Sequence, residues 1–161
     1  MTRQGLAAEP AGPAVPPLAP GPGRLGRVLL AYDDAAAATA LADVLRRAGF
    51  CVLVAHSGKQ ALRRLCAEPF DLLITDIVMP EMDGLDLLRW LRRLQTSVPA
   101  IALSGDGPDA GALYAKAALC VGADLTLPEP ADPRTVLAAA HRLAKQGRGA
   151  PTPARVPAPA A

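Results

Sequence analysis

The stretch FDLLITDIVMPEMDG, residues 70–84, decides the fold. Its first half is an apolar run that favours a buried strand, and this strand ends on a single carboxylate, Asp76. A Met-Pro pair and an Asp-Gly turn follow, and both are typical of a loop with a restricted course. The stretch therefore raises the question of why so buried a strand ends on an acid in front of so restricted a loop.

Segments typical of strands and of helices alternate on both sides of this stretch. The strand-like runs are apolar throughout, which favours a sheet that is covered on both faces. The helix-like segments show helical periodicity and N-cap residues, with Asp33 or Asp34 before the first and Ser57 before the second. Such an alternation predicts a parallel α/β sheet of five βα units with right-handed crossovers. The predicted strands span residues 26–32, 51–55, 70–76, 100–104 and 123–127, and the predicted helices span residues 34–49, 57–68, 83–95, 111–122 and 132–146.

Composition narrows the classes of function. The net charge is +2 without a basic block, which argues against binding to nucleic acid or to a membrane surface. No apolar run approaches the ~20 residues that span a bilayer. The three cysteines, Cys51, Cys66 and Cys120, are scattered without metal-ligand spacing, which favours reduced thiols in a cytoplasmic protein.

The length and the distribution of proline predict one domain between two tails. The chain has 161 residues, of which 51% are hydrophobic, and this is enough for one core. Residues 1–23 and 148–161 are rich in Pro and Ala and lack periodic apolar positions, so we expect them to be disordered. The predicted domain is residues 24–147.

Acids and a hydroxyl stand where the predicted strands end. Because the carboxyl ends of parallel strands meet at one edge of a sheet, these groups should lie close together. A single acid there is often only a cap or a turn residue. Several acids at one edge repel one another, and Mg²⁺ held by one or two carboxylates is the usual remedy. The groups are Asp33 and Asp34 after the first strand, Asp76 after the third, Ser104 after the fourth and Glu129 after the fifth.

With these residues in this order, the chain resembles the receiver domain of two-component response regulators. The motif DIVMPEMDG, residues 76–84, matches the family pattern D-x-x-M-P-x-M-D-G. The segments RVLLAYDD, LRRAGF, VAHSGKQAL, PAIALSG and VGAD follow in the expected order, and the resemblance covers residues 26–146. It implies a flavodoxin-like (βα)5 fold, a doubly wound parallel sheet with strand order 2-1-3-4-5.

The resemblance implies roles for the residues at the predicted site. Asp76 would accept a phosphoryl group and form an aspartyl phosphate. Asp33 and Asp76 would ligate Mg²⁺, with the backbone carbonyl of Val78 as a further ligand. Ser104 would be the hydroxyl that turns toward the phosphoryl group and carries the switch.

The same resemblance implies a structure for the surrounding loops. Pro80 and the turn at Asp83 and Gly84 would fix the loop over the site, which accounts for the restricted course noted above. The bond between Glu129 and Pro130 would be a cis peptide.

Three positions depart from the family pattern. Tyr32 occupies the first position of the family's acidic pair, and Asp34 does not replace it because successive strand residues face opposite ways. We therefore expect weaker metal binding. Glu129 replaces the lysine that normally reaches the phosphoryl group, and Thr126 stands where an aromatic residue usually moves with the switch.

The change at residue 129 alters the charge of the site. Asp33, Asp76 and Glu129 sum to −3, so Mg²⁺ would leave −1 before a phosphoryl group adds nearly −2. At ~4 Å and an effective dielectric of about 20, each pair of charges is worth roughly 4 kcal/mol before screening. Glu129 would avoid the repulsion by turning outward, by protonation or by joining the metal shell.

Two hypotheses of function remain. In the first, the protein is a stand-alone receiver that is phosphorylated on Asp76 by a histidine kinase or a histidine phosphotransfer protein. It then acts on an unknown protein target through its fourth helix, fifth strand and fifth helix, and it is not an enzyme. In the second, it is a degenerate receiver that binds a partner without phosphorylation, as Tyr32 and Glu129 favour.

Other classes fit the sequence less well. A phosphatase of the haloacid dehalogenase type needs a second acid two residues after its nucleophile, where this chain has Val78. The glycine-rich motif of a P-loop nucleotide-binding protein is absent from the sequence. A flavodoxin would have hydroxyl residues after its first strand, where this chain has acids and alanines.

Overall fold

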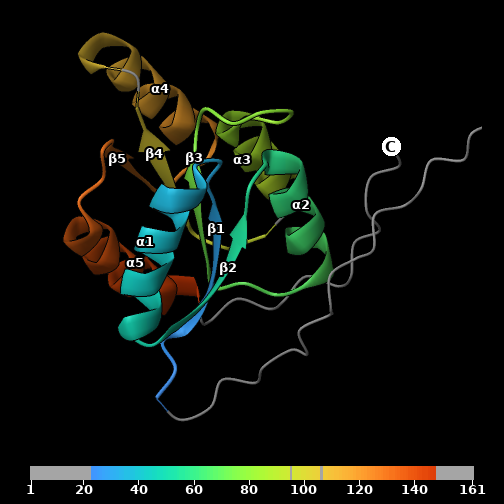
Figure 1. Ribbon diagram of the computed structural model, residues 1–161. Helices are drawn as coiled ribbons and strands as arrows, with labels where there is room; N and C mark the ends of the chain where they lie inside the picture. The colour runs from blue at the N-terminus through green and yellow to red at the C-terminus, as the bar shows by residue number, and fades with distance from the viewer. Residues whose placement is uncertain (1–22, 95, 106, 148–161) are drawn as a thin grey trace, which may run out of the picture.

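Five strands form one parallel sheet. The computed structural model describes residues 23–94, 96–105 and 107–147 of the chain. The strands run in the spatial order β2-β1-β3-β4-β5, and every neighbouring pair is parallel. This confirms the predicted doubly wound order (Figure 1). The strands are β1 (Gly26–Ala31), β2 (Phe50–Ala55), β3 (Leu72–Asp76), β4 (Ala100–Ser104) and β5 (Leu125–Pro128).

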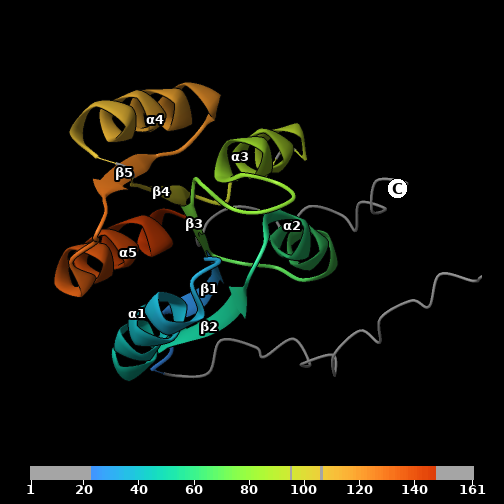
Figure 2. The same cartoon turned by 45° about the horizontal axis from the view of Figure 1, so that its top comes forward.

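Five helices connect these strands and cover both faces of the sheet. Figures 1 and 2 show α1 and α5 on one face and α2 and α3 on the other, with α4 beside β4 and β5. This is the arrangement that right-handed crossovers produce when the chain reverses direction at β1. The helices are α1 (Ala35–Arg47), α2 (Gly58–Ala67), α3 (Gly84–Arg93), α4 (Pro108–Val121) and α5 (Pro133–Gly147).

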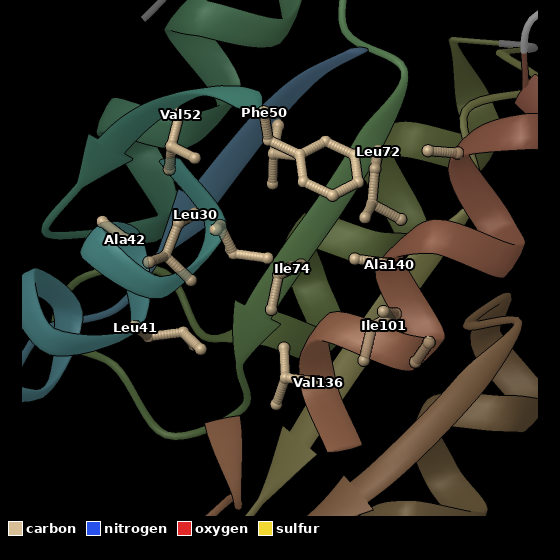
Figure 3. Packing of buried hydrophobic residues seen from close by; sticks show 14 of the residues in the cluster. Leu30, Leu41, Ala42, Phe50, Val52, Leu72, Ile74, Ile101, Val136 and Ala140 are labelled. Atoms are coloured by element: carbon tan, nitrogen blue, oxygen red, sulfur yellow. The ribbon is translucent and has the colours of Figure 1, made fainter. Parts of the chain in front are cut away.

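The core consists of two apolar layers, one on each face of the sheet. Because side chains alternate along a strand, Leu30 and Ile74 enter the layer beneath α1 and α5, which Figure 3 shows. Leu29 and Leu73 enter the layer beneath α2, α3 and α4. Burial of one such side chain stabilises the fold by roughly 2 kcal/mol. The two layers cover both faces of the sheet, so polar groups at the strand ends lie at its carboxyl edge and not on its faces.

Side-chain caps define the first turns of three helices. Asp34 accepts hydrogen bonds from the backbone N–H groups of Ala36 and Ala37, at 2.9 and 3.1 Å, and so caps α1. Ser57 caps α2 and Asp83 caps α3 in the same way. Asp34 is therefore the N-cap of the first helix.

Most predicted boundaries lie within two residues of the observed ones, but the start of α4 was predicted wrongly. The helix begins at Pro108 and not at residue 111, because Gly107 is its N-cap and proline is favourable in a first helical turn. Within the predicted loop 105–111, the residues from Pro108 onward are therefore helical. The start of β5 also shifts, from residue 123 to Leu125, because the N–H of Ala123 bonds the carbonyl of Ala118 at the end of α4.

Two further expectations concern the tails of the chain and membrane-spanning helices. The predicted disordered tails, residues 1–23 and 148–161, lie outside the described residues except for residue 23. Within the described part of the chain, none of the helices is long and apolar enough to cross a bilayer.

Candidate functional site

The predicted site residues meet at the carboxyl edge of the sheet. Asp76 is the last residue of β3 and pairs in register with Leu103 of β4. Ser104 is the last residue of β4 and pairs with Pro128, so Glu129 follows directly after the paired end of β5. Tyr32 follows β1 and donates its N–H to the carbonyl of Ala55 at the end of β2, at 2.9 Å. The strand ends thus bring together groups that are far apart in the sequence.

Asp76 is a buried carboxylate at the centre of this edge. Only 6% of the residue is exposed, and its Oδ1 accepts a hydrogen bond from the N–H of Val78 at 3.2 Å. The pKa of Asp76 is raised from 3.8 to about 7, chiefly by burial and also by the charges of Glu129 and Asp33, while the Val78 hydrogen bond opposes the rise. The repulsion shows that the three carboxylates share one electrostatic environment.

The loop between β3 and α3 is held tightly against the end of β3. The N–H of Gly84 donates to the carbonyl of Ile77 at 2.7 Å, and Met79 is buried in the core. A Cβ atom at Gly84 would lie 2.2 Å from the carbonyl oxygen of Asp76, so only glycine allows this close approach. Pro80 lies in the same loop and is exposed. The Asp-Gly turn therefore lies directly against the backbone of Asp76 and fixes the start of α3 there.

The carboxylates of Asp33 and Asp34, which follow β1, have different surroundings. Asp33 is exposed, and its charge is felt by Asp76. The carboxylate of Asp34 is engaged in capping α1. Asp34 therefore does not replace the missing acid at position 32.

The residues present fit a magnesium ion held by few protein ligands. Among the described residues, no three His, Cys, Asp or Glu side chains gather closely enough to hold a metal. Two carboxylates, Asp33 and Asp76, with the carbonyl of Val78 and water, would supply the hard oxygen ligands that Mg²⁺ prefers. The charges of Glu129 and Asp33 add to the effect of burial in raising the pKa of Asp76, and a bound cation would offset this negative charge.

The two predicted switch residues lie on neighbouring strands. Ser104 is buried, and its hydroxyl donates to the carbonyl of Leu127 at 3.5 Å, so it is held by β5. Thr126 is half-buried and pairs in register with Ala102, two residues before Ser104. The structure thus places both on adjacent strands, with Ser104 at the edge and Thr126 further inside.

The two atypical residues, Tyr32 and Glu129, contact each other. The phenol of Tyr32 donates a hydrogen bond to Oε1 of Glu129. A Cβ atom at Gly105 would lie 2.6 Å from Oε2 of Glu129, so the carboxylate lies over Gly105, the residue that follows Ser104. Of the three alternatives given for Glu129, the structure does not show the outward orientation, because Tyr32 offers the carboxylate a hydrogen-bond donor inside the site.

The environment of Tyr32 keeps its phenol protonated. Burial raises the pKa of Tyr32 well above its ordinary value of 10.0, and the hydrogen bond to Glu129 and the nearby carboxylates raise it further. A protonated phenol can donate to a carboxylate at any physiological pH.

Sequence reasoning missed this pair and one neighbour of it. Tyr32 and Glu129 are 97 residues apart, and each was read only as a departure from the family pattern. Both residues follow the ends of predicted strands, and this common position at one sheet edge was the signal from which their contact could have been predicted. The contact of the exposed His56 was not predicted either: its Nδ1 lies 3.2 Å from the carbonyl oxygen of Tyr32. The Glu129–Pro130 peptide is cis, as predicted.

Comparisons with known proteins point to one family. Residues 28–141 match the family model of the response regulator receiver domain. The chain is 36% identical over 114 residues to the transcriptional regulatory protein CpxR of Escherichia coli, a match that covers 71% of this chain and 47% of CpxR. It is 42% identical over 79 residues to the response regulator receiver protein CpdR of Brucella abortus, which covers 49% of this chain and 66% of CpdR. The chain thus spans about half the length of the CpxR proteins that it matches.

Solved structures give the same picture. The receiver domain of the Francisella response regulator 1452 superposes with a TM-score of 0.70 at 28% identity, over 75% of this chain and 98% of that one. A response regulator from Chloroflexus aurantiacus superposes with a TM-score of 0.69 at 29% identity, over 74% and 98% of the two chains.

Proposed function

This chain belongs to the response regulator receiver domain family, a component of two-component signalling, and from that premise we propose that Asp76 accepts a phosphoryl group from a histidine kinase or a histidine phosphotransfer protein. An oxygen of the Asp76 carboxylate attacks the phosphorus, the bond from phosphorus to the donor's histidine nitrogen breaks, and an acyl phosphate forms. The histidine leaves as a neutral imidazole after it takes up a proton from water.

The observation that carries this proposal is the buried Asp76 carboxylate beside a second acid at the carboxyl edge of the sheet. Its burial supports a nucleophile stripped of most of its water, and its hydrogen bond from Val78 orients one oxygen. Asp33, Asp76 and the Val78 carbonyl would hold Mg²⁺. When bound, this ion supplies positive charge that keeps Asp76 ionised and offsets the charge of the phosphoryl oxygens.

The output of the proposed function is a change in protein contacts. Ser104 and Thr126 lie on the strands next to α4, where they would transmit occupation of the site. Leu113 and Leu119 of α4 are 68% and 50% exposed, which supports a surface that binds a protein. We propose that this surface, with β5 and α5, contacts a downstream target. That the protein acts as a stand-alone receiver, without an attached output domain, stays a prediction.

The proposal also covers the class and the location of the protein. We propose a cytoplasmic phosphoacceptor that does not turn over a substrate as an enzyme and that binds neither nucleic acid nor membrane through this domain. The net charge of +2 without a basic block supports this.

Intact mass spectrometry tests the proposal. The protein is incubated with acetyl phosphate, or with the cognate kinase and ATP, in the presence of Mg²⁺. The mass of one phosphoryl group should appear, should not appear when EDTA is present from the start, and should be absent from Asp76→Asn. Unlabelled wild type under all these conditions would overturn the proposal.

A second candidate is a degenerate receiver that binds its partner without phosphorylation. The hydrogen bond between Tyr32 and Glu129 favours it, because it fixes a negative charge where the family places a lysine. This candidate predicts no labelling and no Mg²⁺ binding by calorimetry. Combined Tyr32→Asp and Glu129→Lys changes should then restore labelling.

A further inference from the structure

The hydrogen bond between Tyr32 and Glu129 crosses the site from one side to the other. Tyr32 follows β1 and Glu129 follows β5, and the sheet order puts β3 and β4 between them. The bond therefore passes the carboxyl ends of the strands that carry Asp76 and Ser104. A contact in this position ties the loop before α1 to the loop before α5.

The surroundings of Glu129 accommodate its inward orientation. Its backbone N–H donates to the carbonyl of Ser104 at 3.0 Å, which sets the start of the side chain. The lack of a side chain at Gly105 leaves room for Oε2, since a Cβ atom there would approach it to 2.6 Å. Among residues 23–94, 96–105 and 107–147, only Tyr32 donates a hydrogen bond to the Glu129 carboxylate.

A half-buried carboxylate needs such a donor to stay where it is. Without one, the lost solvation of the charge is not compensated, and the side chain gains by rotating toward water. Tyr32 therefore decides whether the Glu129 charge stays over Gly105, at the edge of the sheet that also carries Asp76.

Building on the proposed function, we propose that Tyr32 is a positioning residue that holds the negative charge of Glu129 at the site, where this charge opposes the incoming phosphoryl group and favours the binding of a divalent cation. The two effects have opposite signs because the phosphoryl group is an anion and Mg²⁺ is a cation. Tyr32 itself touches neither reactant in this proposal.

Two measurements on the full chain test the inference. The first is the Mg²⁺ dissociation constant by titration calorimetry, without any phosphoryl donor. The second is the rate of labelling by acetyl phosphate at saturating Mg²⁺. Four proteins form the cycle: wild type, Tyr32→Phe, Glu129→Gln and the double variant.

The inference predicts opposite changes in the two measurements. Glu129→Gln keeps the size of the side chain and removes its charge, so labelling should become about tenfold faster and Mg²⁺ binding about tenfold weaker. Tyr32→Phe removes only the hydrogen-bond donor, so labelling should become about threefold faster and Mg²⁺ binding about threefold weaker. The double variant should match Glu129→Gln, because Tyr32 acts only through the Glu129 charge.

Matched controls separate the site from general effects. Tyr114→Phe removes a phenol from α4, and Glu81→Gln removes an exposed charge from the loop between β3 and α3. Neither should change labelling or Mg²⁺ binding. Circular dichroism and thermal unfolding verify that all variants are folded.

Three outcomes would overturn the inference. Loss of both labelling and Mg²⁺ binding in folded Tyr32→Phe would mean a structural role. If Tyr32→Phe has the same effect in the Glu129→Gln protein as in wild type, Tyr32 acts independently of Glu129. Absence of labelling in all four proteins would overturn the proposed function and, with it, the effect of Glu129 on the phosphoryl group. The positioning of Glu129 by Tyr32 would then still be supported if the Mg²⁺ dissociation constants of the four proteins changed as predicted.

Discussion

Replacing Asp76 with asparagine should stabilise the folded protein at pH 8. The pKa of Asp76 is about 7 in the folded protein and 3.8 as the ordinary value, chiefly because of burial and then because of Glu129. An acid with a higher pKa in the folded state binds its proton more tightly there than in the unfolded chain. Its contribution to stability is therefore complete below about pH 4 and is lost as the pH rises to about 7.

The magnitude follows from the two pKa values. Their difference corresponds to roughly 4 kcal/mol between the protonated and the ionised protein. Water at the rim of the sheet screens part of this effect, so we expect a penalty of about 2 kcal/mol at pH 8. The neutral amide of asparagine carries no such penalty.

Urea unfolding of both proteins at pH 5 and pH 8, with EDTA, measures this penalty. The free energy of unfolding of Asp76→Asn relative to wild type should rise by about 1–2 kcal/mol between the two pH values. The exposed acid of α3 gives a control, because Asp86→Asn should show no such rise. A difference between Asp76→Asn and wild type that is the same at both pH values would refute the reasoning.

Three further predictions concern the metal, the loop and a cap. At pH 8, Mg²⁺ at about 100 times its dissociation constant should stabilise wild type by about 2.7 kcal/mol; equal stabilisation of Asp76→Asn would place the ion elsewhere. Gly84→Ala should lower the unfolding free energy by about 2 kcal/mol or more, because its Cβ would lie 2.2 Å from a carbonyl oxygen. Urea unfolding checks this against Gly111→Ala, whose Cβ has ordinary contacts at 3.5 Å, and an equal effect of both changes would contradict it. Asp34→Ala should cost about 1 kcal/mol of stability and leave Mg²⁺ affinity unchanged in calorimetry, whereas weaker Mg²⁺ binding would make Asp34 a ligand.

The fold was predictable because its signals are local. Unbroken apolar runs such as residues 70–75 define buried strands, and Ser57 and Asp83 begin helices where their side chains cap them. The strand order came from the resemblance to a family, since hydrophobic periodicity does not say which strands are neighbours. The start of α4 was missed because glycine and proline were read as loop residues, although Pro108 is favourable in a first helical turn.

The residues of the site were predictable, but their interactions were not. Asp76 and Ser104 follow from their positions at strand ends. The direction of the Glu129 side chain depends on a donor 97 residues away and on the space above Gly105. Such a contact has no local pattern, because it arises only when the sheet brings β1 and β5 into one structure.

The contact between Tyr32 and Glu129 also bears on the history of the sequence. If an ancestor carried the family's usual acid and lysine at these positions, a first change of the lysine to glutamate would have left four carboxylates on one rim. A first change at position 32 would instead have placed a neutral phenol beside a lysine, which repels nothing. Evolution through the second intermediate is the easier route, so relatives with tyrosine and lysine should outnumber those with an acid and glutamate.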